Sequence, residues 1–263
     1  MNKLYLILLL FLPLLAQGQS KITASTAVWP ELQLNYSLGK HDILFLQNQY
    51  RINADAHYND LKESGPLRYF ERVELAMGYE HTFSEHWRGG AILRYAAEDF
   101  PKTLFYTLFL RHNGHVGSLY FNKQAAFEYA DQEARDGFGR FRLEAVLGRR
   151  FPIRRKFITP SVSYEALLLT EFGKNKPLYA ERVIDRTRLR FSLNYELTEK
   201  LRINPYFMRQ TDYYYVQIPP KYNKSGQLQE DGYTTMCNRI SPVAGLELRY
   251  SFNIKPNPAN ITY

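Results

Sequence analysis

The segment that decides the fold is residues 185–197, DRTRLRFSLNYEL. Side chains on a β-strand point alternately to two faces, so every second residue shares a face. One face carries Leu189, Phe191, Leu193 and Tyr195, and the other begins with three arginines. A soluble strand usually has about 5–6 residues, whereas a tilted strand that crosses a bilayer needs about 9–11. The segment therefore predicts a membrane-spanning strand with lipid on one face and a polar interior on the other.

The same alternation recurs along the chain. We expect strands at residues 31–38, 43–53, 67–80, 87–96, 103–112, 116–130, 138–149, 157–170, 185–197, 201–216 and 240–254. The connections alternate between short and long, as in outer-membrane barrels with short periplasmic turns and longer external loops. The pair Asn113-Gly114 is the strongest signal for a two-residue hairpin turn.

These segments predict an all-β, antiparallel, up-and-down transmembrane barrel. Eleven segments are visible, but single-chain bacterial barrels normally have an even number of strands. We therefore expect about 12 strands, with 10 as the alternative. Either residues 20–29 supply a further strand or a lumen segment, or one region hides a split strand.

The first 18 residues, MNKLYLILLLFLPLLAQG, have the parts of a secretory signal peptide. Lys3 is the basic start, residues 4–15 are the apolar part, and Ala16 and Gly18 are small residues before the expected cleavage site. Cleavage after Gly18 would leave residues 19–263 as a single barrel domain. The prediction is export to the outer membrane of a Gram-negative bacterium, with outer-membrane lipid as a partner.

The composition narrows the classes of partner. The chain has a formal net charge of +8 and one cysteine, Cys237, so no internal disulfide can stabilise it. A basic protein suggests nucleic acid as a partner, but export and the spacing of the arginines along strands argue against it. Anionic lipid head groups and small anionic solutes are the partners that we expect.

Because alternate residues of a strand share a face, we assign one set of residues to the lumen and another to the lipid. The predicted lumen network comprises Arg68, Arg72, Glu74, Arg88, Arg94, Arg140, Arg142, Glu144, Glu165, Arg186, Arg188, Arg190, Glu196, Arg202, Glu247 and Arg249, with Glu80 and Glu128 on the same face. The predicted lipid-facing residues are Leu189, Phe191, Leu193, Tyr195, Leu246, Leu248 and Tyr250. The lumen set permits two roles, a structural filling of ion pairs and a narrow pore in which excess arginine favours anions.

Two other classes of protein remain as alternatives. A soluble periplasmic ligand-binding barrel would show the same alternation with its faces exchanged. A lipid-modifying enzyme would need serine, histidine and an acidic or amide group together. Five of the six histidines, His41, His81, His86, His112 and His115, fall in or beside short turns, and only His57 lies in a long loop. We therefore expect no catalytic residue, no metal and no cofactor.

Two resemblances support the barrel. Residues 245–252, GLELRYSF, look like the assembly signal in the final strand of outer-membrane barrels, which implies the barrel-assembly machinery as a partner. Residues 139–151 (GRFRLEAVLGRRF), 163–168 (SYEALL) and 185–207 (DRTRLRFSLNYELTEKLRINPYF) resemble an uncharacterised outer-membrane barrel family, domain of unknown function 2490. That resemblance implies a signal peptide, one barrel domain and an outer-membrane location, and it implies no active site.

Overall fold

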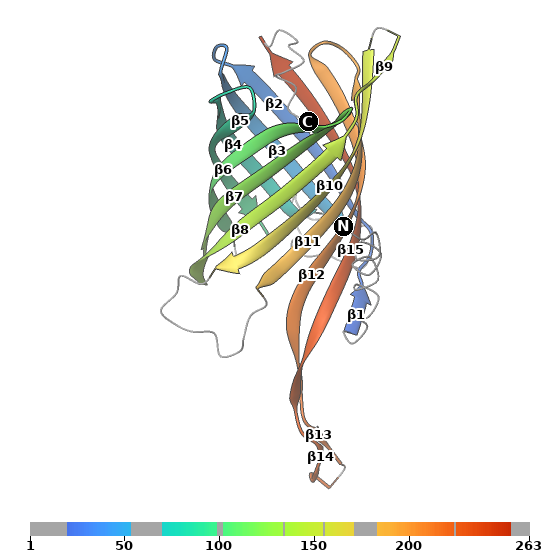
Figure 1. Cartoon of the computed structure of the whole chain (residues 1–263). Coiled ribbons are helices and arrows are strands. Elements are labelled where there is room, and N and C mark those ends of the chain that lie inside the picture. Colours follow the sequence, from blue (N-terminus) through green and yellow to red (C-terminus); the bar gives the residue numbers. More distant parts are fainter. Residues whose placement is uncertain are drawn as a thin grey trace, which may run out of the picture.

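The computed structural model of the chain is a closed β-barrel (Figure 1). It describes residues 20–53, 70–98, 102–133, 135–154, 156–170, 183–223 and 225–253, so residues 1–18 and His57 lie outside the described residues. The barrel wall consists of β2 (Ala27–Ser37), β3 (Asp42–Asn53), β4 (Phe70–Thr82), β5 (Trp87–Ala97), β6 (Thr103–Val116), β7 (Leu119–Gln132), β8 (Arg135–Gly148), β10 (Lys156–Thr170), β11 (Ile184–Glu196), β12 (Leu201–Ile218) and β15 (Tyr233–Phe252). Four short strands lie outside the wall: β1 (Ser20–Thr23), β9 (Phe151–Ile153), β13 (Lys221–Tyr222) and β14 (Leu228–Glu230).

The prediction of an all-β barrel is confirmed, but the barrel closes in a way that the sequence analysis does not predict. Ten of the neighbouring wall pairs are antiparallel, and the ring closes through a parallel pair between β15 and β2, with Val243 opposite Ala27. The ring has eleven strands, one fewer than the twelve that we expect from the sequence. An odd number of alternating strands brings the last strand back in the direction of the first, so the expectation of a wholly antiparallel barrel is wrong at this one pair.

Residues 20–29 do supply a short further strand, β1, but it does not make a twelfth strand of the ring. β1 pairs with β15 in parallel, with Ser20 opposite Cys237, and residues 27–29 open β2. No helix in the part of the chain that the structure describes is long and apolar enough to cross a membrane.

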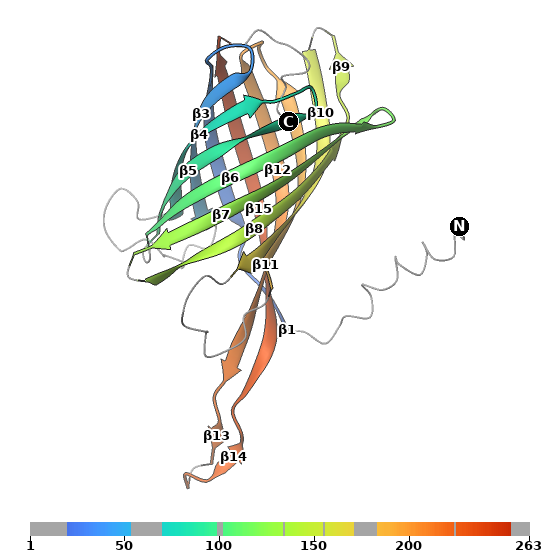
Figure 2. The same cartoon turned by 60° about the vertical axis from the view of Figure 1, so that its left-hand side comes forward.

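The two ends of the barrel differ. The turns at residues 38–41, 83–86, 117–118 and 197–200 lie at one end, which we call the short-turn end; the other is the far end. β12 and β15 continue past the barrel at the far end as a long hairpin that carries β13 and β14 (Figure 2). The connection between β7 and β8 at the far end is tight, so short and long connections do not alternate strictly.

The predicted hairpin turn at Asn113-Gly114 is wrong. β6 runs through both residues, with Asn113 opposite Asn122, and the chain turns at Gly117, where φ is +60°. A methyl group on Gly114 would lie 3.2 Å from both the His112 ring and the Phe121 carbonyl oxygen, so the strand is tightly packed there. The later turn also lets the Tyr120 ring lie over Gly148 on β8.

The two faces of the wall differ in polarity. Large apolar side chains point outward and are exposed, among them Leu108 at 64%, Met77 at 59% and Phe191 at 54%. Charged side chains point inward and are buried, including Glu128 at 0% and Arg88 at 2%. Two small apolar clusters interrupt this interior: Ala27, Trp29, Tyr206, Met208 and Val243 form one, and Ala96, Phe105 and Ala130 form the other. The interior is therefore mainly a charged lumen.

Inward aromatic rings lie over glycines on the neighbouring strand. Tyr206 is opposite Gly245, and a Cβ atom added to that glycine would lie 2.0 Å from the ring. The Arg190 guanidinium also stacks on this ring, 3.6 Å from its centroid. Phe45 lies over Gly78 in the same way.

Gly245→Ala should therefore destabilise the barrel. The Tyr206 ring cannot move aside without losing its contact with Arg190, and overpacking of this kind costs about 1–3 kcal/mol. The measurement is the urea midpoint of the folded protein in detergent micelles. Gly39→Ala is the control, because nothing lies within 4 Å of a methyl group there. Equal midpoints for the two variants would contradict the packing argument.

Candidate functional site: the charged lumen

The lumen is lined by arginines and carboxylates that neighbouring strands bring into register. On β11, Arg188 and Arg190 point inward because they share one parity of the strand. Arg188 lies opposite Glu165 of β10, and its Nη1 atom is 2.9 Å from Oε2 of that glutamate. The three alternate arginines of β11 bind carboxylates on three different strands: Arg188 binds Glu165 of β10, Arg186 binds Asp212 of β12, and Arg190 binds Glu247 of β15.

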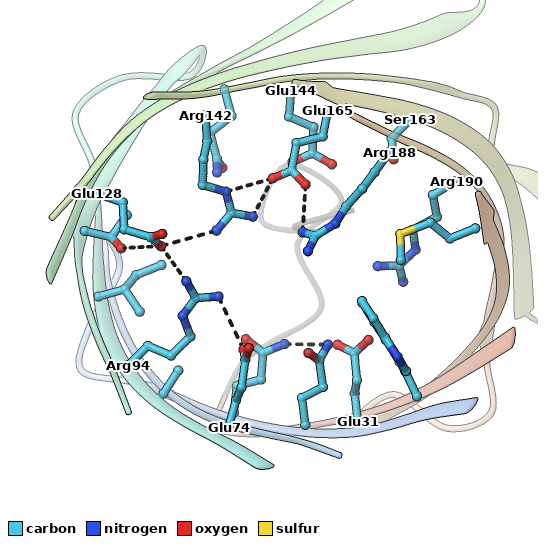
Figure 3. Close-up of a pocket in the computed structure, with 18 of the residues that line it drawn as sticks. Glu31, Glu74, Arg94, Glu128, Arg142, Glu144, Ser163, Glu165, Arg188 and Arg190 are labelled. Carbon is cyan, nitrogen blue, oxygen red and sulfur yellow. Dashed lines mark hydrogen bonds and ion pairs between the residues drawn. The ribbon is translucent and has the colours of Figure 1, made fainter. Parts of the chain in front are cut away.

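Glu128 is the centre of the network (Figure 3). It is fully buried, accepts hydrogen bonds from Arg94 of β5 and Arg140 of β8, and forms a longer ion pair with Arg142 of β8. Arg94 Nη2 lies 2.6 Å from Oε2, Arg142 Nη1 lies 3.6 Å away, and Arg140 also binds the carboxylate. Thr107 donates a further hydrogen bond of 3.2 Å. This carboxylate of β7 thus contacts side chains from β5, β6 and β8, so four consecutive strands of the wall meet at it.

Ion pairs continue from this centre in both directions around the wall. Arg94 also reaches Glu74, at 3.3 Å, and Glu74 binds Arg51 at 2.8 Å. On the other side, Arg142 Nε donates to Glu165 at 2.7 Å. Figure 3 shows these side chains projecting from all sides of the wall toward the barrel axis. The central layer is therefore a nearly continuous ring of alternating charges.

Smaller groups of charges lie toward each end. At the short-turn end, Glu80 binds Arg111 at 3.1 Å and Arg88 at 3.5 Å. Near the same end, Glu247 binds Arg190 at 3.3 Å and Arg249 at 3.1 Å. Toward the far end, Arg186 binds Asp212, and Arg72 binds Glu98 at 2.7 Å.

Two glutamates of the central layer are bound differently. Glu31 accepts hydrogen bonds from Gln47, at 3.1 Å, and from the Tyr206 hydroxyl. Glu144 is half-buried, lies opposite Glu165, and forms no ion pair within the described part of the chain. These two carboxylates face the central space of the lumen.

The space left by these side chains forms three successive chambers. Their volumes are about 160 Å³ at the short-turn end, about 250 Å³ in the centre and about 470 Å³ at the far end. Gln47, Ile92 and Gln124 line both the first and second chambers, and Trp29 and Arg51 line both the second and third. The lumen is therefore narrow and divided at two levels.

The chambers differ in charge. The central chamber is balanced, since its lining contains Arg51, Arg94, Arg142, Arg188 and Arg190 together with Glu31, Glu74, Glu128, Glu144 and Glu165. The far chamber has four arginines and three acidic groups, namely Arg51, Arg72, Arg186, Arg239, Glu71, Glu98 and Asp212. The short-turn chamber has two arginines, Arg111 and Arg249, and one glutamate, Glu80. Counted by its own lining, each end chamber thus has one more arginine than acidic groups, with Arg51 of the far chamber also counted in the central one.

Most of the predicted lumen residues come together in this network. Glu196 and Arg202 lie at its edge near the short-turn end, where Glu196 binds Arg150 at 2.9 Å, and Arg68 lies outside the described residues. The predicted lipid-facing residues lie on the outward face, where Phe191 is 54%, Leu246 43% and Leu193 40% exposed, while Leu189, Tyr195, Leu248 and Tyr250 are half-exposed. The predicted lumen set lacks Glu31, Arg51, Arg111 and Asp212, although each lies on the same face of its strand as its polar neighbours.

The described histidines gather at one end of the barrel. His41, His81, His86, His112 and His115 all lie at the short-turn end, where His81 Nδ1 is 2.7 Å from Asp42 Oδ1. Over the described ranges, no three histidine, cysteine or acidic side chains are grouped to hold a metal ion.

No protein-family model, curated protein or solved structure matches the chain. The resemblance to domain of unknown function 2490 therefore stays a prediction.

Proposed function

We propose that the protein is an outer-membrane β-barrel with a narrow lumen that admits small anions. The polarity of the wall carries this proposal: Glu128 and Arg88 are buried inside, while Leu108 and Met77 are exposed outside. Soluble monomers rarely expose large contiguous apolar patches, whereas a barrel in lipid has an apolar outer band and a polar interior. This inversion also argues against a soluble ligand-binding barrel, whose interior would be apolar.

The lengths of the wall strands support the same proposal. They have 11 to 20 residues, which meets the requirement of about 9–11 residues for a tilted strand that crosses a bilayer. In this proposal residues 1–18 direct export, residues 245–252 are read by the barrel-assembly machinery, and the short-turn end faces the periplasm.

The proposed solute follows from the chambers. Their volumes leave no room for a large substrate, and the excess of arginine at both ends favours anions. The balanced ring around Glu128 narrows the path between the ends. We propose a low-conductance path for small inorganic anions.

Planar bilayers separated by unequal KCl concentrations test this proposal. A small current whose reversal potential has the sign of chloride preference is expected. A heat-modifiable, vesicle-inserted barrel that passes no current would leave a structural role. A protein that remains in the aqueous phase would contradict the membrane location.

Arg239→Gln should weaken the anion preference. Arg239 lines the far chamber, and its loss removes the positive excess there. On the order of a two-fold drop in the chloride-to-potassium permeability ratio is expected, because charged rings of this kind set selectivity. Arg209→Gln is the matched control, because Arg209 is exposed on the outward face of β12. Equal shifts in both variants would mean that lumen charge does not set the preference.

A further inference from the structure

A groove crosses the outer surface of the wall over β5 to β10. Its volume is about 740 Å³, within the range of about 300–1,000 Å³ that is usual for small-molecule sites. The small side chains of Ala125, Ala145 and Ala166 leave this space, and Leu110 and Leu143 are among the larger side chains around them. The groove is therefore an apolar channel in a surface that otherwise carries bulky side chains.

One cation stands at the side of this groove. Lys123 of β7 points outward between His112 of β6 and Ala145 of β8, four residues from the start of its strand at the short-turn end. It is exposed and forms no ion pair among the described residues. Outward positions on β7 nearer its centre carry Ala125, Phe127 and Tyr129. A lone cation at an apolar outward position calls for an anionic partner.

The direction of the lysine side chain indicates where that partner lies. Its Nζ atom is 5.2 Å from the ring centroid of Phe121, which is two residues nearer the short turn. Long basic side chains extend in this way toward a polar interface while their methylenes stay on apolar surface. The ammonium group is thus held on the short-turn side of the groove.

Aromatic rings flank the same position. Trp87 and His112 also line the groove, and their rings make an edge-to-face contact with centroids 4.8 Å apart. Tryptophan is enriched at the level of lipid head groups. Arg149, which is exposed and directly follows β8, adds a second cation beyond the short-turn edge of that strand.

We propose that this groove binds one anionic phospholipid of the leaflet at the short-turn end. Its phosphate lies at the Lys123 ammonium group, and one acyl chain lies along Ala125, Ala145 and Ala166. The occupant is a lipid because the groove is apolar and continuous with the outward face. It is anionic because Lys123, the charged lining residue on an outward position, is a cation without an ion pair among the described residues, whereas Glu144 shares the inward parity of Arg142 and also lines the central chamber. The inference rests on the proposed membrane location.

Quenching of tryptophan fluorescence by brominated lipids measures this binding directly. The chain has two tryptophans; Trp87 lines the groove, whereas Trp29 is buried in the lumen and gives a constant background. The full-length mature protein is inserted into phosphatidylcholine vesicles that contain an equal fraction of brominated phosphatidylglycerol or brominated phosphatidylcholine. About a five-fold preference for phosphatidylglycerol at Trp87 is expected, the effect of one basic residue at a membrane surface.

Two pairs of variants separate the lysine from the groove. Lys123→Gln should abolish the preference, while Arg209→Gln, which removes an outward cation elsewhere, should retain it. Ala145→Phe should fill the groove and reduce quenching by phosphatidylglycerol, while Ala244→Phe, on the outward face of β15, should not. Heat-modifiable mobility on a gel shows that each variant is folded.

The outcomes distinguish this inference from the proposed function. Equal quenching by the two lipids in the inserted wild type, or an unchanged preference in Lys123→Gln, would overturn the lipid site and leave the membrane barrel in place. Failure of the wild type to insert into vesicles would overturn both.

Discussion

Glu128→Gln is expected to lower the free energy of unfolding by about 3–5 kcal/mol, the cost of removing one partner from a buried ion pair. The carboxylate is fully buried and is shared by Arg94, Arg140 and Arg142. A glutamine amide can accept a hydrogen bond from one of these arginines, but it cannot neutralise three adjacent cations. Urea unfolding in detergent micelles measures the loss, and the heat-modifiable gel shift should disappear at a lower temperature.

Glu144→Gln is the matched control. It removes the same charge from the same central chamber, but Glu144 is half-buried and forms no ion pair within the described residues. A loss below about 1 kcal/mol is expected, as for substitutions that break no buried network. Similar losses in both variants would show that net charge, and not the pairing at Glu128, stabilises the lumen.

The positions and faces of the strands could be predicted from the sequence because alternation is a local property. The quoted segment, residues 185–197, corresponds to β11, Ile184–Glu196, and Phe191 is on the exposed face as its parity requires. A one-residue error would exchange the two faces, so a long alternating strand fixes its own orientation.

Closure of the barrel could not be predicted in this way. The pairing of β15 with β2 joins the two ends of the described chain, and the parallel direction follows from the total number of strands. The Asn113-Gly114 pair is also a local signal, for a hairpin turn, but tertiary packing overrides it. Extending β6 to Val116 places Arg111 against Gln124, with hydrogen bonds of 2.8 and 3.0 Å, and places the Tyr120 ring over Gly148.

Sequence parity also predicted which arginines face the lumen but not which carboxylates they bind. Arg188 and Glu165 are on adjacent strands and could be paired once the register is known. Arg94 and Glu128 are on β5 and β7, with β6 between them, so their contact depends on the curvature of the wall. Long side chains in a narrow barrel thus make contacts between strands that are not neighbours, and the order of the strands does not predict these contacts.

If the protein is the outer-membrane barrel that we propose, Leu108→Arg should destabilise it in phospholipid vesicles by about 2–4 kcal/mol, the cost of an arginine on a lipid face near the bilayer midplane. Leu108 is near the middle of β6, points outward between Ala91 and Phe127, and is 64% exposed. The guanidinium group would have to leave water or distort the lipid around it. Urea unfolding from vesicles measures the change, and the amount of folded protein in the outer membrane should fall with it.

Leu38→Arg provides the depth control that makes this result decisive. Leu38 is 55% exposed, but it follows β2 in a short turn, where the same substitution should cost only about 0–1 kcal/mol. If water, and not lipid, surrounded the wall, Leu108→Arg would remove exposed apolar surface and make the protein more soluble at no cost in stability. A clearly larger loss in Leu108→Arg than in Leu38→Arg therefore indicates lipid at the outward face, and equal small losses indicate water.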